Sequence, residues 1–169
     1  MAVKICIIGA AGRMGKNIAE AVYNNENADA AGAVDRKGSD VLGQNLYETA
    51  GCGKGGPVIT DDILESAKNA DVIIDFTGAE PTYNNLSIYE KAGKPIVIGS
   101  TGFSDEQKKA VEKLSEKVPV VLAPNMSLGV NVALELIKEA ARLLKGYDIE
   151  LVETHHNMKK DAPSGTRSD

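Results

Sequence analysis

The chain has 169 residues, 43% of them hydrophobic, and carries a formal net charge of −5. At this length it can bury a core without disulfides or metal ions, and its negative charge argues against a general surface for nucleic acid or anionic membranes. Aromatic residues make up only 4% and Trp is absent, so we expect a core of Val, Ile, Leu and Ala, which suits a parallel sheet covered by helices.

The cysteines and the apolar segments indicate the cellular compartment of the protein. Cys6 and Cys52 form neither a disulfide pattern nor a metal-ligand spacing. Residues 1–8 lack the layout of a signal peptide, and no apolar stretch approaches the length that spans a bilayer. We therefore expect a reduced, cytoplasmic protein without a metal site, in which Cys52 is an idle thiol.

A glycine-rich turn follows the first apolar run. We expect a strand over residues 3–8, a turn over 9–15 and a helix over 16–22. Glycines at positions 9, 12 and 15 would allow a sharp turn, a close approach of a phosphate to the backbone and tight packing of the helix on the strand. The spacing is a variant of the dinucleotide-binding fingerprint. A plain strand-to-helix turn without a ligand is the alternative.

The second strand, expected over residues 29–34, ends at an acidic residue. Asp35 lies 20 residues past Gly15, where NAD-binding folds place the carboxylate that binds the adenosine ribose. The alternative is a turn residue at the strand end. Arg36 instead favours NADP, because an Arg at this position can pair with the 2′-phosphate of that nucleotide, and Arg13 could assist it. The residues thus leave the choice between NADH and NADPH open.

Strands and helices then alternate along the chain. Residues 37–57 are rich in glycine and predict an irregular loop with a short turn at 41–43. Further strands are expected over 57–59, 71–76, 95–99 and 119–123, and helices begin near Asp62, Pro81 and Ser104, the last with a capping box to Gln107. This alternation predicts an α/β fold with a doubly wound, parallel, Rossmann-type sheet.

Four loops fall at the carboxyl ends of the expected strands, where such sheets bind their ligands. They are residues 9–15, 75–78, 99–102 and 123–126. From residue 127 the pattern changes to a long helix that ends at Gly146 and a half-exposed strand over 147–154. We expect a dinucleotide-binding domain over 1–126 and the beginning of an α+β substrate domain over 127–169.

Residues 155–167 hold both histidines and a dense group of cations. An imidazole exchanges protons near neutral pH, and ammonium groups neutralise carboxylates, so the segment suggests a receptor for a small carboxylated substrate. A metal site formed by His155, His156 and Asp161 is one alternative, although the flanking lysines would repel a cation. A disordered tail is the other.

Four segments of the chain form a set of motifs: Gly-Ala-Ala-Gly-Arg-Met-Gly at 9–15, Gly-Ser-Thr-Gly-Phe at 99–103, Ala-Pro-Asn-Met-Ser at 123–127, and Glu-x-His-His-x-x-Lys-x-Asp-Ala-Pro-Ser-Gly-Thr at 153–166. In these motifs and in their order, the chain resembles the dihydrodipicolinate (4-hydroxy-tetrahydrodipicolinate) reductases. The four segments cover the chain almost from end to end, and the last is long and specific.

The resemblance implies an oxidoreductase of lysine (diaminopimelate) biosynthesis that transfers a hydride from NADH or NADPH to a cyclic unsaturated dicarboxylate. It implies His155 as proton donor with Lys159 as its catalytic partner, and His156, Gly165 and Thr166 as ligands of the substrate carboxylates. The positions implied to bind the nucleotide are Gly9, Ala10, Ala11, Gly12, Arg13, Met14, Asp35, Arg36, Gly99, Ser100, Thr101, Ala123, Pro124, Asn125 and Met126. The family forms homotetramers.

The sequence departs from the family pattern at its end. Arg167 is an unexpected residue after Gly165-Thr166, and family members continue through a mixed sheet that supports the last motif. A catalytic constellation needs such support to hold its geometry. The second hypothesis is therefore a nucleotide-binding fragment without turnover.

Overall fold

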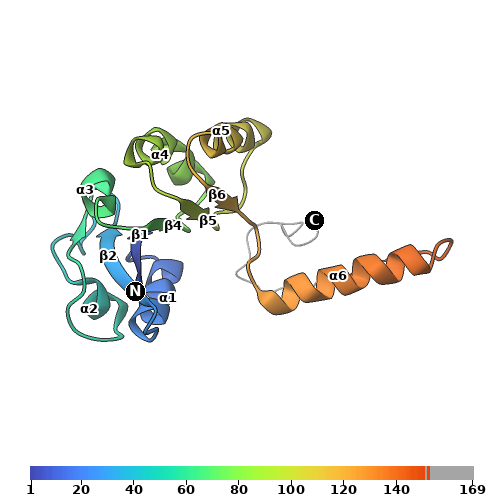
Figure 1. The fold of residues 1–169 in the computed structure, drawn as a ribbon, viewed down its shortest axis with the longest axis horizontal. Helices are drawn as coiled ribbons and strands as arrows, with labels where there is room; N and C mark the ends of the chain where they lie inside the picture. Colours follow the sequence, from blue (N-terminus) through green and yellow to red (C-terminus); the bar gives the residue numbers. More distant parts are fainter. Residues whose placement is uncertain (151, 153–169) are drawn as a thin grey trace. The chain divides into compact units, whose positions relative to one another are not determined.

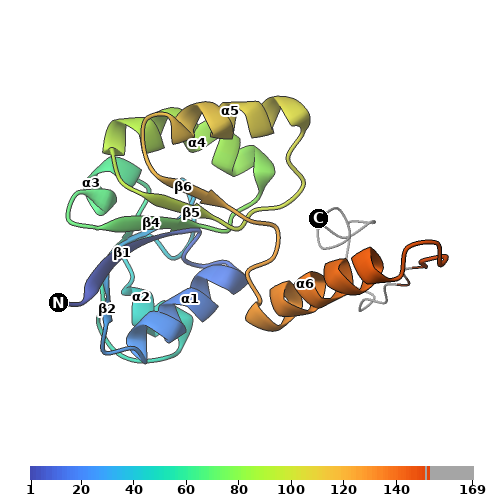
Figure 2. The ribbon, with the colours of Figure 1, turned by 45° about the vertical axis from the view of Figure 1, so that its right-hand side comes forward.

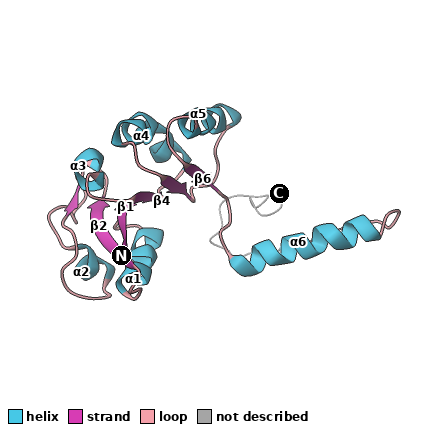
Figure 3. Cartoon of the chain, in the orientation of Figure 1, coloured by secondary structure: helices cyan, strands magenta, loops and turns pink. Residues whose placement is uncertain are grey.

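The computed structural model describes residues 1–150 and residue 152. The chain divides into two compact units, Met1–Leu122 and a unit that begins at Ala123. The first unit holds a six-stranded sheet with five helices, and the described part of the second holds one helix (Figures 1 and 3).

All six strands of the sheet are parallel. They run in the order β3-β2-β1-β4-β5-β6, so the strand order reverses between β1 and β4. The predicted doubly wound parallel sheet is confirmed, and its ligand crevice is expected at this reversal, beyond the carboxyl ends of the strands. The strands are β1 (Val3–Ile8), β2 (Ala28–Val34), β3 (Ile59–Thr60), β4 (Val72–Asp75), β5 (Ile96–Ile98) and β6 (Val120–Leu122).

Helices cover both faces of the sheet. Helices α1 and α2 lie on one face, and α3, α4 and α5 lie on the other (Figure 2). Their bounds are α1 (Arg13–Tyr23), α2 (Leu46–Ala50), α3 (Ile63–Ala67), α4 (Ala79–Ala92) and α5 (Asp105–Ser115).

Side chains of β1 alternate between two hydrophobic cores. Ile5 and Ile7 pack with the core on the α1 side, and Cys6 and Ile8 pack with the core on the α4 side. A strand at the centre of a parallel sheet is covered on both faces, which explains its unbroken apolar run. The expectation of a purely aliphatic core is wrong in one respect, because Tyr89 is completely buried and is the largest such side chain of the described residues.

Two predicted helix starts are confirmed. Ser104 and Gln107 form the expected capping box at the start of α5, and the Asp62 carboxylate accepts a hydrogen bond from the Glu65 N–H at the start of α3. Helix α4 ends at Gly93, whose φ of 64° is the left-handed conformation that glycine adopts at low cost.

The structure corrects three sequence-based boundaries. Helix α1 begins at Arg13 rather than residue 16, because Gly12 already serves as its N-cap. Residues 46–50, expected in an irregular loop, form α2, whose Leu46 is completely buried against the sheet. Burial of this one side chain stabilises a single turn of helix that is too short to be stable by itself. Strand β3 lies at Ile59–Thr60, slightly later than expected.

The second unit contains α6 (Leu128–Leu143), which begins at the Ser127 cap and has no buried side chain. It ends before Gly146. Residues 147–150, expected to begin a strand, form none, and of the remainder of 147–154 only Val152 is described. A strand needs a neighbour for its backbone hydrogen bonds, and none lies beside these residues in the described part of the chain. Among the described helices, none has the length and apolar character needed to cross a membrane.

Candidate functional site

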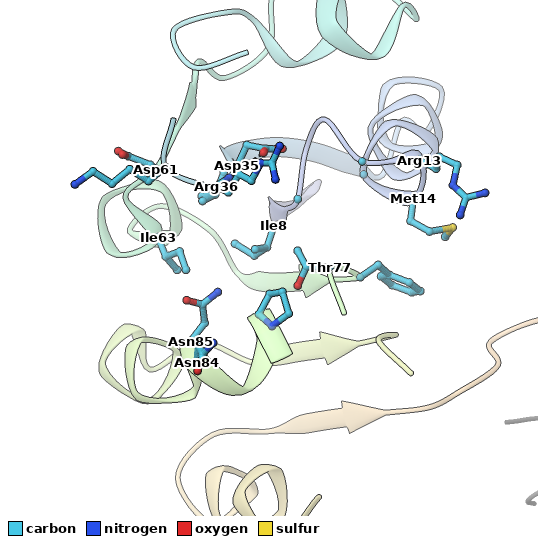
Figure 4. Close-up of a pocket in the computed structure, with 17 residues that line it drawn as sticks. Ile8, Arg13, Met14, Asp35, Arg36, Asp61, Ile63, Thr77, Asn84 and Asn85 are labelled. Atoms are coloured by element: carbon cyan, nitrogen blue, oxygen red, sulfur yellow. Dashed lines mark hydrogen bonds between the residues drawn. The ribbon is translucent and has the colours of Figure 1, made fainter. Parts of the chain in front are cut away.

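A pocket in the first unit lies beyond the carboxyl ends of β1, β2 and β4 (Figure 4). In the close-up, Asp35 and Arg36 lie on one side of it, and Asn84 and Asn85 of α4 lie on the other. The residues that line the pocket are Ile8, Gly9, Gly12, Arg13, Met14, Gly15, Val34, Asp35, Arg36, Lys37, Asp61, Ile63, Phe76, Thr77, Pro81, Asn84 and Asn85.

The glycine turn has a shape that side chains would block. Gly9 has a φ of 79°, a left-handed conformation that L side chains rarely adopt. A Cβ on Gly15 would overlap the carbonyl oxygen of Gly9, so α1 packs on the turn only because Gly15 has no side chain. Gly12 caps α1 without a side-chain hydrogen bond. The N–H groups at the start of α1 are therefore available to an anion, as phosphate sites require.

Asp35 connects the end of β2 to this turn. Its Oδ2 accepts a hydrogen bond from the Ala11 N–H at 2.8 Å, and its Oδ1 accepts one from the Arg36 N–H at 2.8 Å. Each oxygen of a carboxylate can accept a second hydrogen bond. Asp35 is thus held in place and retains acceptor positions for a ligand hydroxyl.

The pocket also presents basic side chains. Arg13, Arg36 and Lys37 line it, together with the acidic Asp35 and Asp61. None of the three cations takes part in an ion pair with another described residue. They remain available to a phosphate group.

Ala10 and Ala11 were expected to bind the nucleotide, and the structure restricts how they could. The Ala10 side chain is completely buried in the core on the α1 side. The Ala11 N–H donates to Asp35, and neither residue lines the pocket.

The expected nucleotide residues after β5 do not line this pocket, but they are tied to residues that do. Phe76 occupies the space that a side chain on Gly99 would need. Ser100 is buried, and its hydroxyl accepts a hydrogen bond from the Gly78 N–H at 2.9 Å. The loop after β5 is therefore held against the loop after β4. Thr101 is exposed.

The remaining expected residues belong to the second unit. Ala123, Pro124, Asn125 and Met126 directly follow β6, and the Asn125 side chain accepts a hydrogen bond from the Ser127 N–H at 2.9 Å. The catalytic and substrate positions His155, His156, Lys159, Gly165 and Thr166 lie outside the described residues, as do the metal alternative's residues.

Sequence reasoning missed one wall of the pocket. Pro81, Asn84 and Asn85 line it from α4, and Asp61 and Ile63 line it from the start of α3. The spacing of 81, 84 and 85 places three side chains on one helical face, which is a signal that the sequence contains. That this face turns toward the glycine turn is decided by the crossover of α4 over the sheet.

Comparison with known families gives this pocket its context. The family model described as "Dihydrodipicolinate reductase, N-terminus" matches residues 3–126. A second family model, described as "Dihydrodipicolinate reductase, C-terminus", matches residues 129–168. The chain belongs to the dihydrodipicolinate reductase family. The two matches meet close to the division between the two compact units.

Curated relatives of the chain are named 4-hydroxy-tetrahydrodipicolinate reductase. The 4-hydroxy-tetrahydrodipicolinate reductase of Syntrophotalea carbinolica is 48% identical over 165 residues, which are 97% of this chain and 62% of the relative. That of Hahella chejuensis is 48% identical over 164 residues, 96% of this chain and 61% of the relative. The chain thus spans about three fifths of the length of these relatives.

A solved structure of the family shares the fold. Dipicolinate-bound dihydrodipicolinate reductase from Paenisporosarcina sp. TG-14 matches with a TM-score of 0.74 and 31% identity. The match covers 99% of this chain and 63% of that one.

Proposed function

We propose that this reductase-family chain binds NADH or NADPH in the pocket beyond β1, β2 and β4 and serves the reduction of a cyclic unsaturated dicarboxylate to tetrahydrodipicolinate in lysine biosynthesis. One observation carries the nucleotide part. The start of α1, to which no side chain makes a capping hydrogen bond, lies beside an acceptor carboxylate, Asp35, that is held by the Ala11 N–H of the same turn. Backbone donors for phosphate next to an acceptor for ribose hydroxyls are what a dinucleotide requires.

The residues of the pocket suggest how each part of the nucleotide is held. The N–H groups at the start of α1 bind the phosphates, and Asp35 accepts hydrogen bonds from the adenosine ribose. Arg36, with Arg13 and Lys37 near it in the pocket lining, supplies positive charge for a 2′-phosphate. This arrangement supports acceptance of both nucleotides. We extend the proposal to Gly99–Thr101, which follow β5 at the same edge of the sheet, and to residues 123–126, which the family match over residues 3–126 includes.

The bound reduced nicotinamide supplies the hydride. For the remaining chemistry we propose His155 as the proton donor, Lys159 as its partner, and His156, Gly165 and Thr166 as ligands of the substrate carboxylates. This part is supported by the family match over 129–168 and by the cations of the segment, which suit a dianionic substrate. The solved relative is titled as bound to dipicolinate, a small dicarboxylate. We also propose a cytoplasmic location, which the two free cysteines support. A homotetrameric assembly completes the proposal.

Calorimetric titration with NADH and NADPH tests the nucleotide site. Replacing Asp35 with Ala is expected to weaken NADH binding about tenfold, because a hydrogen bond to a charged group is lost. Replacing Arg36 with Ala is expected to weaken NADPH binding while leaving NADH binding within about twofold. A wild-type chain that binds neither nucleotide would refute the proposed function.

Oxidation of the reduced nucleotide in the presence of the dihydrodipicolinate substrate tests the chemistry on the same preparation. The double variant His155→Ala, Lys159→Ala should bind NADH as the wild type does and turn over no substrate. An active double variant would refute the residue assignment. Binding without turnover in the wild type would favour the second hypothesis, a nucleotide-binding fragment.

A further inference from the structure

Three polar side chains are buried in the described part of the chain, and all three belong to one hydrogen-bonded cluster. They are Asp75 at the end of β4, Thr82 on α4 and Ser100 after β5. Thr77, an exposed residue of the loop after β4, joins them. Since buried polar groups are costly unless paired, a cluster at the edge of a ligand pocket needs an explanation.

The Asp75 carboxylate is completely buried, and both of its oxygens accept hydrogen bonds. Oδ1 accepts from the Thr77 N–H at 2.8 Å and from the Thr77 hydroxyl at 2.6 Å. Oδ2 accepts from the Tyr89 hydroxyl at 2.7 Å. Burial, and then the nearby Asp75 charge, raise the pKa of Tyr89, so the phenol keeps its proton and donates. No described cation pairs with Asp75.

The carboxylate sets the direction of every other hydrogen in the cluster. The Thr77 hydroxyl donates its only hydrogen to Asp75. In its 3.4 Å contact with the Thr82 hydroxyl it must therefore accept the hydrogen bond. Thr82 then has no hydrogen left for Ser100, which lies 3.0 Å away and therefore donates to it. Ser100 in turn accepts from the Gly78 N–H. The Thr77 hydroxyl is thus held facing inward by the hydrogen bond that it donates to Asp75 and the one that it accepts from Thr82.

With the hydroxyl facing inward, the methyl group of Thr77 faces the glycine turn. It occupies the space in which a side chain on Gly9 would lie: a Cβ built there would be 2.7 Å from the Thr77 Cγ2. Figure 4 shows the Thr77 oxygen turned away from the glycine turn. The methyl therefore supports Gly9, which begins the turn that leads to the start of α1.

We propose that Asp75 is a positioning residue of the nucleotide site, which fixes the rotamer of Thr77 so that the Thr77 methyl supports the phosphate-binding glycine turn at Gly9. This inference rests on the proposed nucleotide function. On this inference, the hydroxyl and the methyl group of Thr77 have separate roles. The hydroxyl stabilises the fold by satisfying Asp75, and the methyl keeps the turn in its binding conformation.

Two substitutions at Thr77 separate the role of the hydroxyl from the role of the methyl group. Thr77→Ser keeps the hydroxyl and removes the methyl, so we expect a melting temperature close to that of the wild type and NADH binding about fivefold weaker, because the turn must be ordered on binding. Thr77→Val keeps a methyl against Gly9 and leaves Asp75 short of a donor, so it should melt well below the wild type and bind NADH more tightly than Thr77→Ser does. A purely structural role would change stability and affinity together.

Two substitutions at Asp75 test its positioning role. Asp75→Ala removes the acceptor of the Thr77 hydroxyl and releases the Thr77 rotamer, so NADH binding should weaken about fivefold, as in Thr77→Ser. Asp75→Asn is the conservative variant: its amide oxygen must face the Thr77 N–H, because the amide nitrogen cannot accept, and so Thr77 keeps its rotamer. We expect Asp75→Asn to recover most of the NADH affinity that Asp75→Ala loses. Wild-type affinity in Thr77→Ser or in Asp75→Ala would overturn the proposal, as would an Asp75→Asn variant that binds NADH no better than Asp75→Ala.

Amide hydrogen exchange of the ligand-free protein separates failure of this inference from failure of the proposed function. The Ala11 N–H donates to Asp35 and the Gly12 N–H donates to the Gly9 carbonyl, so both report the order of the turn. Their exchange is expected to accelerate in Thr77→Ser and in Asp75→Ala, and to return toward the wild-type rate in Asp75→Asn. If the wild type bound no NADH, the proposed function would fail, and unchanged exchange in Thr77→Ser would still overturn the support of Gly9 by Thr77.

Discussion

Replacing Tyr89 with Phe removes a single oxygen from the largest fully buried side chain of the described residues. That oxygen donates the hydrogen bond, 2.7 Å long, to the Oδ2 of the buried Asp75. A hydrogen bond to a charged group contributes about 1.5–3 kcal/mol net, and the loss leaves one side of a buried carboxylate without a donor. We expect the free energy of unfolding to fall by about 2 kcal/mol and the melting temperature by roughly 8 °C.

Urea unfolding followed by circular dichroism measures this change, with the m-value compared between variants to verify that the unfolding reaction is the same. Tyr83→Phe is the matched control. Tyr83 lies on the same helix, α4, and makes no hydrogen bond to a described side chain, so its substitution should change stability by less than about 0.5 kcal/mol. Equal stability of the two variants would show that Asp75 does not depend on the phenol, and the account of the buried cluster would then be wrong.

Two further predictions concern the glycine turn and a buried thiol. Gly15→Ala should lower stability by about 2 kcal/mol or more and weaken NADH binding, since its Cβ would overlap the Gly9 carbonyl oxygen. Gly129→Ala in α6, whose Cβ would meet the Ser127 Oγ at an ordinary contact distance of 4.0 Å, should be neutral or slightly stabilising in the same melts. Burial raises the pKa of the Cys6 thiol to about 12, so a thiol reagent at pH 8 should label it only on unfolding. The pKa of the thiol in the unfolded chain is 9.0, so the contribution of Cys6 to stability is present below about pH 9 and is lost as the pH rises toward 12. Rapid labelling of Cys6 in the native protein would contradict its burial.

Local chemistry made much of the fold predictable. The apolar run of β1, the glycine turn and the Ser104–Gln107 capping box act within a few residues, so each is visible in the sequence and present in the structure. Asp35 could also be placed, because the length of one strand–helix–strand unit fixes where β2 ends beside the glycine turn. The short helix α2 was missed because its stabilisation comes from burial of Leu46 beneath it rather than from helix propensity.

The sequence by itself determined the family, the alternation of strands and helices, and the residues at the carboxyl ends of the strands, since these follow from periodicity and from motifs of adjacent residues. Tertiary structure alone decided which distant residues share a site. It brought Asn84 and Asn85 to the pocket and placed the Thr77 methyl against Gly9. It also buried Asp75 where three donors reach it, one of them from Tyr89, 14 residues away on α4. The reason is physical: the direction of a side chain and the partner that satisfies a buried carboxylate depend on how helices cross the sheet, and no local pattern encodes that crossing.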